Sequence, residues 1–202
     1  MLRCILCFII CFSSALATAG TIERQPGESA DAFVRRIAPR GTGVAHKPIE
    51  TSVWQYSAPV IVAFYEQQPA PDDNTASTKI DGFVFIPVVG AKYEKVEIDS
   101  FEPEGGNPHV ETVFFASTDK TQDKKLIVIV SREQNHADVK GNLYDTFVYR
   151  SPGAPLPKKL TYLKAISEKL SGGCDCRRTD GPSTKAKFKT AADVKAELKK
   201  LQ

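Results

Sequence analysis

The sequence predicts an α+β protein: a mainly antiparallel sheet of six or seven strands, with a short N-terminal helix and two C-terminal helices packed on one face. Three observations support this class. Runs rich in β-branched and aromatic residues recur between residues 52 and 150, helical periodicity is confined to a stretch near residue 30 and to residues 160–201, and short polar loops join the later strand-like runs. The composition, 42% hydrophobic and 25% charged, is that of an ordinary folded chain.

Residues 1–19 have the features of a secretory signal peptide. Arg3 supplies a positive charge, residues 4–12 are apolar, and small residues follow, with cleavage expected after Ala19 or, as second choice, after Ala17. The apolar run is shorter than the roughly 20 residues that cross a bilayer, and no later run is long enough. We therefore expect an exported chain, periplasmic or secreted, with no transmembrane segment in its mature form.

Charge divides the expected mature chain, residues 20–202, which we predict to be a single α+β domain. Residues 20–157 carry 14 basic and 19 acidic residues and are mostly strand-like, whereas residues 158–202 carry 12 basic and 5 acidic residues and form a basic, helical C-terminal part. The formal net charge of the whole chain is only +3, so no global field favours nucleic acid as a partner.

The first predicted element is a helix over residues 30–37. Ser29 can cap it, Phe33, Val34 and Ile37 share one face, and Pro39 follows its end. Strands are then predicted over residues 52–57, 60–66, 82–89, 93–101, 110–117, 126–132 and 143–150. Because Pro59 separates the first two runs, they form either one bent strand or two, and the last three form a meander.

Two helices are predicted at the C-terminus. The first covers residues 160–170 and ends at Gly172 and Gly173, which can adopt a left-handed cap. The second begins at a capping box made by Thr190 and Asp193. The segment between them, residues 174–189, is polar and is expected to be irregular. The apolar stripes of the two helices consist of Leu160, Leu163, Ile166 and Leu170, and of Val194, Leu198 and Leu201.

The most unusual local sequence is an acidic segment over residues 92–111. Residues two positions apart on a strand point to the same face of the sheet. This spacing separates Glu97 from Asp99 and His109 from Glu111. If the two strands pair, up to four such groups converge and could bind a cation or a cationic partner. The alternative is a solvated sheet face beside a rigid turn. The candidate binding residues are Glu97, Asp99, Glu102, Glu104, His109 and Glu111.

A second candidate is the Asp-rich turn at residues 117–125, which leads into an apolar strand. It resembles a single hairpin of the FG-GAP family, whose turn binds calcium through Asp at alternate positions. Asp119 and Asp123 fit two such positions, but Thr121 replaces a carboxylate, and Lys120 and Lys124 would repel a cation. A solvated β-turn is therefore the default prediction for this segment.

Two cysteines remain after the expected cleavage, Cys174 and Cys176. Thiols this close in an oxidising compartment do not usually stay free. Three outcomes compete: a local disulfide that staples the turn after residues 160–170, a pair of intermolecular bridges, or a redox-active dithiol. The local disulfide is favoured, because no C-x-x-C motif accompanies the pair.

No sequence motif specifies a reaction. There is no nucleophile elbow, no phosphate loop and no dinucleotide fingerprint, and His46, His109 and His136 lack zinc-ligand spacing. We therefore expect no cofactor and no metal. The first hypothesis is an exported, non-catalytic protein of the bacterial envelope that binds a protein or an anionic polymer, with an inhibitor or immunity role among the possibilities. The alternative is a small exported hydrolase that uses carboxylates and His109 around residues 97–111.

Overall fold

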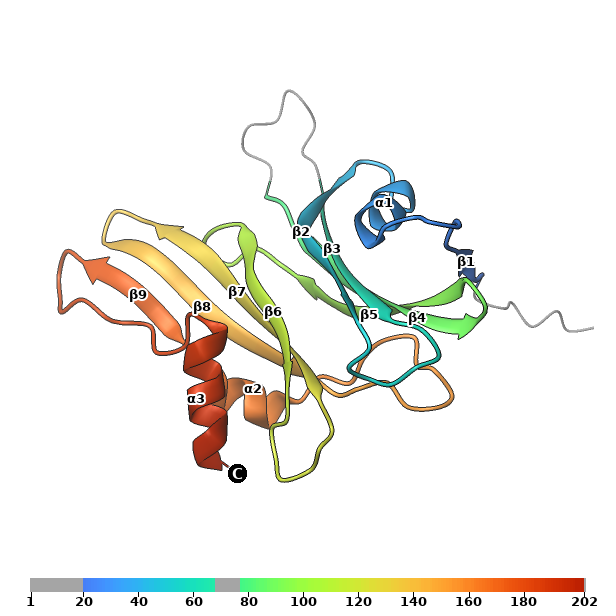
Figure 1. Cartoon of the computed structure of the whole chain (residues 1–202). Coiled ribbons are helices and arrows are strands. Elements are labelled where there is room, and N and C mark those ends of the chain that lie inside the picture. The colour runs from blue at the N-terminus through green and yellow to red at the C-terminus, as the bar shows by residue number, and fades with distance from the viewer. Residues whose placement is uncertain (1–19, 68–76, 202) are drawn as a thin grey trace, which may run out of the picture.

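A computed structural model describes residues 20–67 and 77–201 of the chain, so the predicted signal peptide lies outside the described residues. The α+β class is confirmed: nine strands form two antiparallel sheets, accompanied by three helices, in the described ranges (Figure 1). The number of sheets differs from the prediction, because the strands form two sheets and not one sheet of six or seven strands. None of the described helices is long and apolar enough to span a membrane.

The first sheet has the order β1-β5-β4-β3-β2 and the second the order β6-β7-β8-β9. The strands of the first sheet are β1 (Ile22–Glu23), β2 (Thr42–Thr51), β3 (Val60–Gln67), β4 (Ile80–Val89) and β5 (Lys92–Phe101). Those of the second are β6 (Pro108–Ala116), β7 (Lys125–Asn135), β8 (Val139–Tyr149) and β9 (Gly173–Arg178). The helices are α1 (Ala30–Arg36), α2 (Lys164–Leu170) and α3 (Ala191–Leu201).

The continuous apolar runs of β3 and β7 explain the layered architecture, because successive side chains of a strand point to opposite faces. In β3, Val62 belongs to the core between the two sheets, whereas Ile61 packs toward α1. In β7, Val128 belongs to the same inter-sheet core, whereas Ile127 packs toward α2 and α3. The two sheets therefore share one core, and each has a second core on its outer face.

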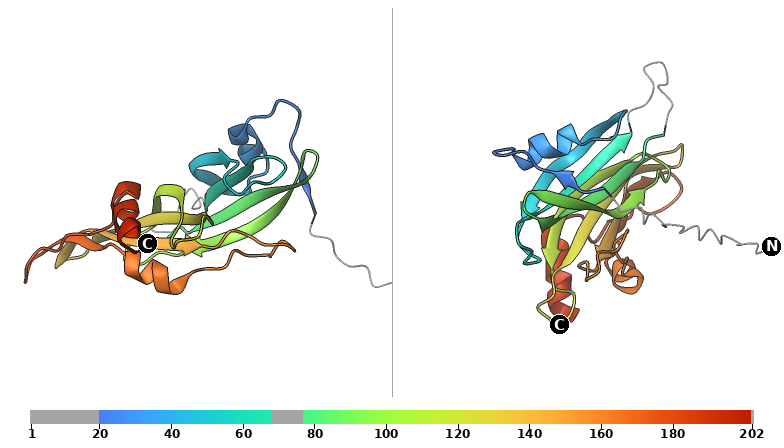
Figure 2. Two further views of the ribbon diagram at one scale, coloured as in Figure 1. Left: turned by 60° about the horizontal axis from the view of Figure 1, so that its bottom comes forward. Right: turned by 90° about the vertical axis from the view of Figure 1, so that its right-hand side faces the viewer.

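The helices lie on both outer faces and not on one, which corrects the predicted packing. Phe33 and Val34 of α1 are buried against the first sheet, and Val194 and Leu198 of α3 are buried against the second. Figure 2 shows α1 and α3 at separate ends of the molecule. A single sheet with one covered face cannot bury the runs of β3 and β7 on both sides, so a second covering layer is required for each.

The strand predicted over residues 52–57 is wrong; the chain there forms a turn, and the strand β2 precedes it. Pro48 falls in an irregularity of the β2–β3 register, between His46 and Ile49, and an edge strand tolerates it there. Trp54 and Tyr56 are half-buried and pack against the edge of the inter-sheet core from within the turn. Their aromatic character therefore reflects burial and not strand formation.

The C-terminal part also departs from the predicted boundaries. Residues 158–160 run along the free edge of β5, where the Glu97 N–H donates to the Lys158 carbonyl and the Leu160 N–H donates to the Glu97 carbonyl. The helix predicted over residues 160–170 consequently begins only at Lys164. The segment 174–189, predicted to be irregular, supplies most of strand β9, which pairs with β8.

The predicted N-terminal caps of the first and last helices are confirmed, whereas the left-handed cap predicted after residue 170 is wrong, because α2 ends at Ser171 with an extended backbone. The Ser29 hydroxyl accepts a hydrogen bond from the Ala32 N–H at 3.1 Å. At α3 the Thr190 hydroxyl accepts from the Asp193 N–H at 3.2 Å, while the Asp193 carboxylate accepts from the Thr190 N–H at 3.0 Å. These reciprocal contacts satisfy backbone donors that a helix leaves unpaired at its start.

Candidate functional site

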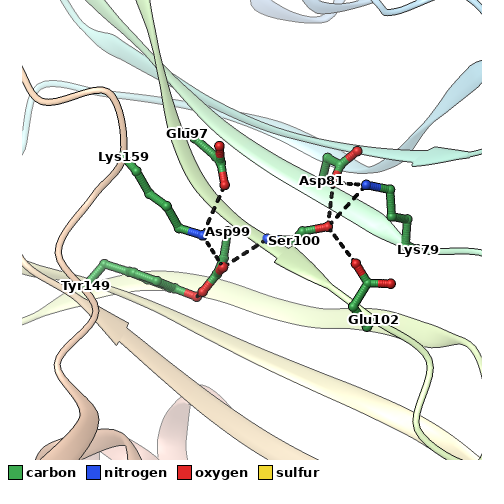
Figure 3. Close-up of polar contacts among 8 residues, drawn as sticks. All are labelled: Lys79, Asp81, Glu97, Asp99, Ser100, Glu102, Tyr149 and Lys159. Atoms are coloured by element: carbon green, nitrogen blue, oxygen red, sulfur yellow. Dashed lines mark hydrogen bonds and ion pairs between the residues drawn. The ribbon is translucent and has the colours of Figure 1, made fainter.

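The structure brings Glu97 and Asp99 together, but around a lysine from a distant segment. The Lys159 ammonium lies 3.0 Å from the Glu97 carboxylate and 2.7 Å from that of Asp99 (Figure 3). A register shift in the β4–β5 pairing leaves Ile98 as the extra residue between the two acids. The contact is possible because residues 158–160, which belong to the connection from β8 to α2, run beside β5. This ion pair therefore holds that connection against the first sheet.

Asp99 has further donors that occupy both of its oxygens. The buried Tyr149 hydroxyl donates to Oδ2 at 2.8 Å, and the Ser100 N–H donates to Oδ1 at 3.0 Å. Burial raises the pKa of Tyr149, and the neighbouring Asp99 carboxylate raises it further. A carboxylate with this many donors is a structural anchor, because none of its oxygens is left to act on a substrate.

A second group of charges lies beside it on β4 and β5. The Ser100 hydroxyl donates to Asp81 at 2.6 Å, and Lys79 lies 3.2 Å from the same carboxylate (Figure 3). The Glu102 carboxylate lies 3.3 Å from the Ser100 oxygen, which has only one proton and has given it to Asp81. Asp81 is therefore compensated within the sheet, whereas the carboxylate of Glu102 is exposed.

The remaining predicted residues do not join this cluster. The two strands that had to pair for convergence belong to different sheets: β5 is in the first and β6 in the second. His109 is exposed on β6, and Glu111 lies at a bulge of the same strand, where it accepts from the Ser131 hydroxyl at 2.6 Å. Glu104 sits in the connecting loop, and its carbonyl accepts from Gln134 at 2.8 Å. Within the described ranges, no three His, Cys, Asp or Glu side chains are grouped so as to hold a metal ion.

The Asp-rich turn is the loop that joins β6 to β7, over residues 117–124, and its two carboxylates are also engaged. Asp119 accepts from the Thr121 N–H at 2.9 Å and from the Thr121 hydroxyl, and these bonds lower the pKa of Asp119. Asp123 pairs with Lys125 and accepts from Ser151 at 2.8 Å, and the Lys125 contact lowers the pKa of Asp123. The acids stabilise the turn separately and do not converge as calcium ligands would.

Two hollows of the surface flank this loop. The first, of about 380 Å³, lies between the loop and α3, with Phe115 and Leu198 among its lining residues. The second, of about 620 Å³, lies between the loop and the start of α2, with Tyr162 and Ile166 among its walls. Figures 1 and 2 both show the loop beside the C-terminal end of α3.

The walls of these hollows are strongly basic. Two acidic residues, Asp119 and Asp123, line them, against seven basic ones: Lys120, Lys124, Lys195 and Lys199 in the first hollow, and Lys125, Arg150 and Lys164 in the second. This local excess of positive charge is larger than the net charge of +3 of the whole chain. We call this surface, loop 117–124 with the two hollows, the basic end of the molecule.

The basic end could not be recognised from the sequence as one site. In the sequence, the lysines of the turn were interpreted only as groups that would repel a cation. Those of the last helix were counted only within the basic C-terminal part. Lys120 and Lys195 are far apart in the chain, and only the packing of α3 beside the β6–β7 loop places them in the same hollow. The common signal was an excess of lysine in both segments.

The structure contains a disulfide between Cys174 and Cys176, the local bridge that the sequence favoured. It lies within the strand β9 and not in a turn after α2. Asp175, between the two cysteines, pairs with Lys189 at 2.6 Å, and this contact lowers the pKa of Asp175. The ion pair holds β9 to the segment that precedes α3, whereas the bridge links two residues within β9.

No protein-family model matches the sequence, and neither the curated proteins nor the solved structures include a significant match.

Proposed function

We propose that this chain is an exported, non-catalytic binding protein of the bacterial envelope, and that the basic end is its binding surface. One observation carries the proposal: Glu97, Asp99 and Glu111, three of the acids that the sequence singled out, are engaged within the protein, whereas seven basic residues line the two open hollows of the basic end. A surface of this charge supports an anionic polymer of the envelope as the partner.

The hydrolase alternative finds no support in the geometry. A general acid or base must reach a substrate proton within hydrogen-bonding distance. Glu97 and Asp99 share the ammonium of Lys159, and Asp99 also receives the Tyr149 hydroxyl. His109 is exposed on the other sheet and, in the described part of the chain, forms no hydrogen bond or ion pair with either acid.

The basic end is held by rigid elements, which favours binding because less order has to be gained when a ligand arrives. Leu198 anchors α3 in the outer core with 2% of its surface exposed. On the other side, the Trp54 indole N–H donates to the Lys124 carbonyl at 2.7 Å and fixes the loop to the turn before β3.

The proposal is tested by localisation and by sedimentation. The full chain, expressed with its own N-terminus in a bacterium, is expected in the periplasm or the medium. After purification it should sediment with isolated envelope material at low salt and be released at high salt, because salt screens contacts between exposed charges. Retention in the cytosol, or absence from the sedimented envelope at low salt, would contradict the proposal.

A further inference from the structure

We propose that the first hollow of the basic end binds the phosphate groups of a linear, phosphate-bearing polymer. This inference rests on the proposed function, because it assigns the chemistry of the partner at the same surface. The carrying observation is a set of four lysines that two separate elements direct to one hollow: Lys120 and Lys124 from the loop, and Lys195 and Lys199 from α3.

The two lysines that α3 contributes to the first hollow carry like charges on the same face of the helix. Lys195 and Lys199 are four residues apart, so they lie on one face of α3, where two like charges destabilise a helix. Lys195 also lies over the ring of Phe114, with its ammonium 5.1 Å from the ring centroid. A ligand of opposite charge would relieve the repulsion that the free protein retains.

Neighbouring lysines of the C-terminal part show the contrast. Lys185 and Lys189 pair with Asp175, and Lys187 and Lys200 pair with Glu197. In the described part of the chain, no such ion pair involves any of the four lysines of the first hollow. The single acid of that hollow, Asp119, is occupied by Thr121. The charge of the hollow is therefore left for an external anion.

The side-chain type points to phosphate. A planar carboxylate is best matched by the fork of an arginine guanidinium, and the first hollow has lysines only. Compact ammonium groups approaching from two walls suit an anion with oxygens in several directions, as in a tetrahedral phosphate. Arg150 of the second hollow continues the positive surface past the loop, whereas Lys164 there pairs with Glu168 at 3.7 Å. This continuation favours a chain with repeated phosphates over one isolated ion.

A flat anionic membrane fits this surface less well than a chain does. The lysines of the first hollow come from two separate elements, the loop and α3, with the hollow between them, so a chain can enter where a bilayer would meet only the rims. Binding to anionic vesicles is accordingly an outcome that the test must separate from binding to a polymer.

The test titrates the purified protein with inorganic polyphosphate. Trp54 is the one tryptophan of the chain and bonds to the backbone of the loop, so its fluorescence reports on ligand at this surface. The double variant Lys195→Glu/Lys199→Glu is expected to weaken binding by about tenfold or more, since each lysine near an anionic surface contributes about a factor of five. The matched control is Lys92→Glu/Arg40→Glu, which changes the net charge equally at two exposed sites away from the basic end.

The control double variant should bind as the unmodified protein does. The inference fails if the protein does not bind polyphosphate, if the two double variants lose affinity equally, or if polygalacturonate or anionic vesicles bind as tightly as polyphosphate. If the α3 variant does not fold by circular dichroism, Lys120→Glu on the opposite wall replaces it, with Lys92→Glu as its control. If the unmodified protein sediments with envelope material in a salt-dependent way but does not bind polyphosphate, the proposed function stands while this inference fails.

Discussion

Single carboxylates in this protein act as anchors for distant segments. Asp99 receives donors from Tyr149, Ser100 and Lys159, and so ties β8 and the chain after it to the first sheet. Glu28 performs a similar task at the N-terminus, where Arg36 bonds both of its oxygens, at 2.7 and 2.8 Å. In each case the acid was visible in the sequence, whereas its partner followed only from the fold.

Tyr149→Phe should destabilise the protein by about 1–2 kcal/mol, because the buried Asp99 oxygen loses a donor while the ring volume is kept. Urea unfolding followed by circular dichroism measures the change. Tyr162→Phe is the control, since Tyr162 is 40% exposed, and it should change stability by less than about 0.5 kcal/mol. Equal stability of the two variants would show that the Tyr149–Asp99 bond contributes nothing.

The ion pair of Glu28 with Arg36 should make the free energy of unfolding depend on pH. The Arg36 hydrogen bonds lower the pKa of Glu28 from 4.5 to about 2. A lowered pKa in the folded state means that its stabilisation is present above pH 4.5 and is lost as the pH falls toward 2. Glu28→Gln should therefore lose less stability than the unmodified protein does across this interval, as measured by urea unfolding at a series of pH values.

The control for this experiment is Glu133→Gln, because Glu133 is exposed and forms no ion pair in the described part of the chain. Its profile should parallel that of the unmodified protein. Glu28→Gln curves that also run parallel to the unmodified protein would show that the contact with Arg36 is not maintained in solution.

At the scale of elements, edge strands required the most help from the fold. The edge of β5 that faces away from β4 is covered by β1 at Lys92 and Tyr93, and by residues 158–160 at Glu97. The free edge of β9 is covered where the Cys176 and Thr184 backbones exchange hydrogen bonds at 3.2 and 2.8 Å. Covering an edge removes a surface on which other strands could pair. These covering segments are short and polar, so their sequences do not read as strands.

The helix α3 combines a core role with a surface role, and Leu198→Ala separates the two. Removing this buried side chain should cost about 2–5 kcal/mol in the free energy of unfolding, because a cavity remains in the outer core. Lys199→Ala, at the adjacent exposed position, should leave stability within about 0.5 kcal/mol. Thermal unfolding that is unchanged in Leu198→Ala would mean that α3 is not docked as described.

At the scale of the whole molecule, four layers are stacked in the order α1, the first sheet, the second sheet, and α2 with α3. The inter-sheet core includes Phe101 from the first sheet and Tyr149 from the second, so the sheets cannot separate without exposing buried aromatic surface. This arrangement leaves the ends of the sandwich for loops, and the basic end is one of them.

Export and the disulfide make a joint prediction for the whole chain. Protein recovered from the periplasm or medium should begin at Gly20 or, as second choice, at Thr18, and its intact mass under non-reducing conditions should be two hydrogens below that of the dithiol form. Reduction and alkylation should then add label at Cys174 and Cys176. Two free thiols before reduction, a disulfide-linked dimer, or a retained N-terminus would each contradict a part of this prediction.

The sequence by itself determined the α+β class, the capped helices α1 and α3 and most of the central strands, and it favoured the local pairing of Cys174 with Cys176 over two alternatives. These features depend on neighbours within about ten residues: apolar periodicity, cap residues and adjacent thiols. The prediction of helices on one face missed that the apolar runs of β3 and β7 are covered on both faces, and a run cannot say which element covers each face.

Only the tertiary structure decided the division into two sheets, the separation of β5 from β6, and the position of β9. It also decided which charges are paired. Lys159 pairs with both Glu97 and Asp99, which were predicted as part of a site, and α3 brings two lysines beside the β6–β7 loop. The physical reason is that charge compensation depends on distance in space, which a sequence does not record for residues far apart in the chain.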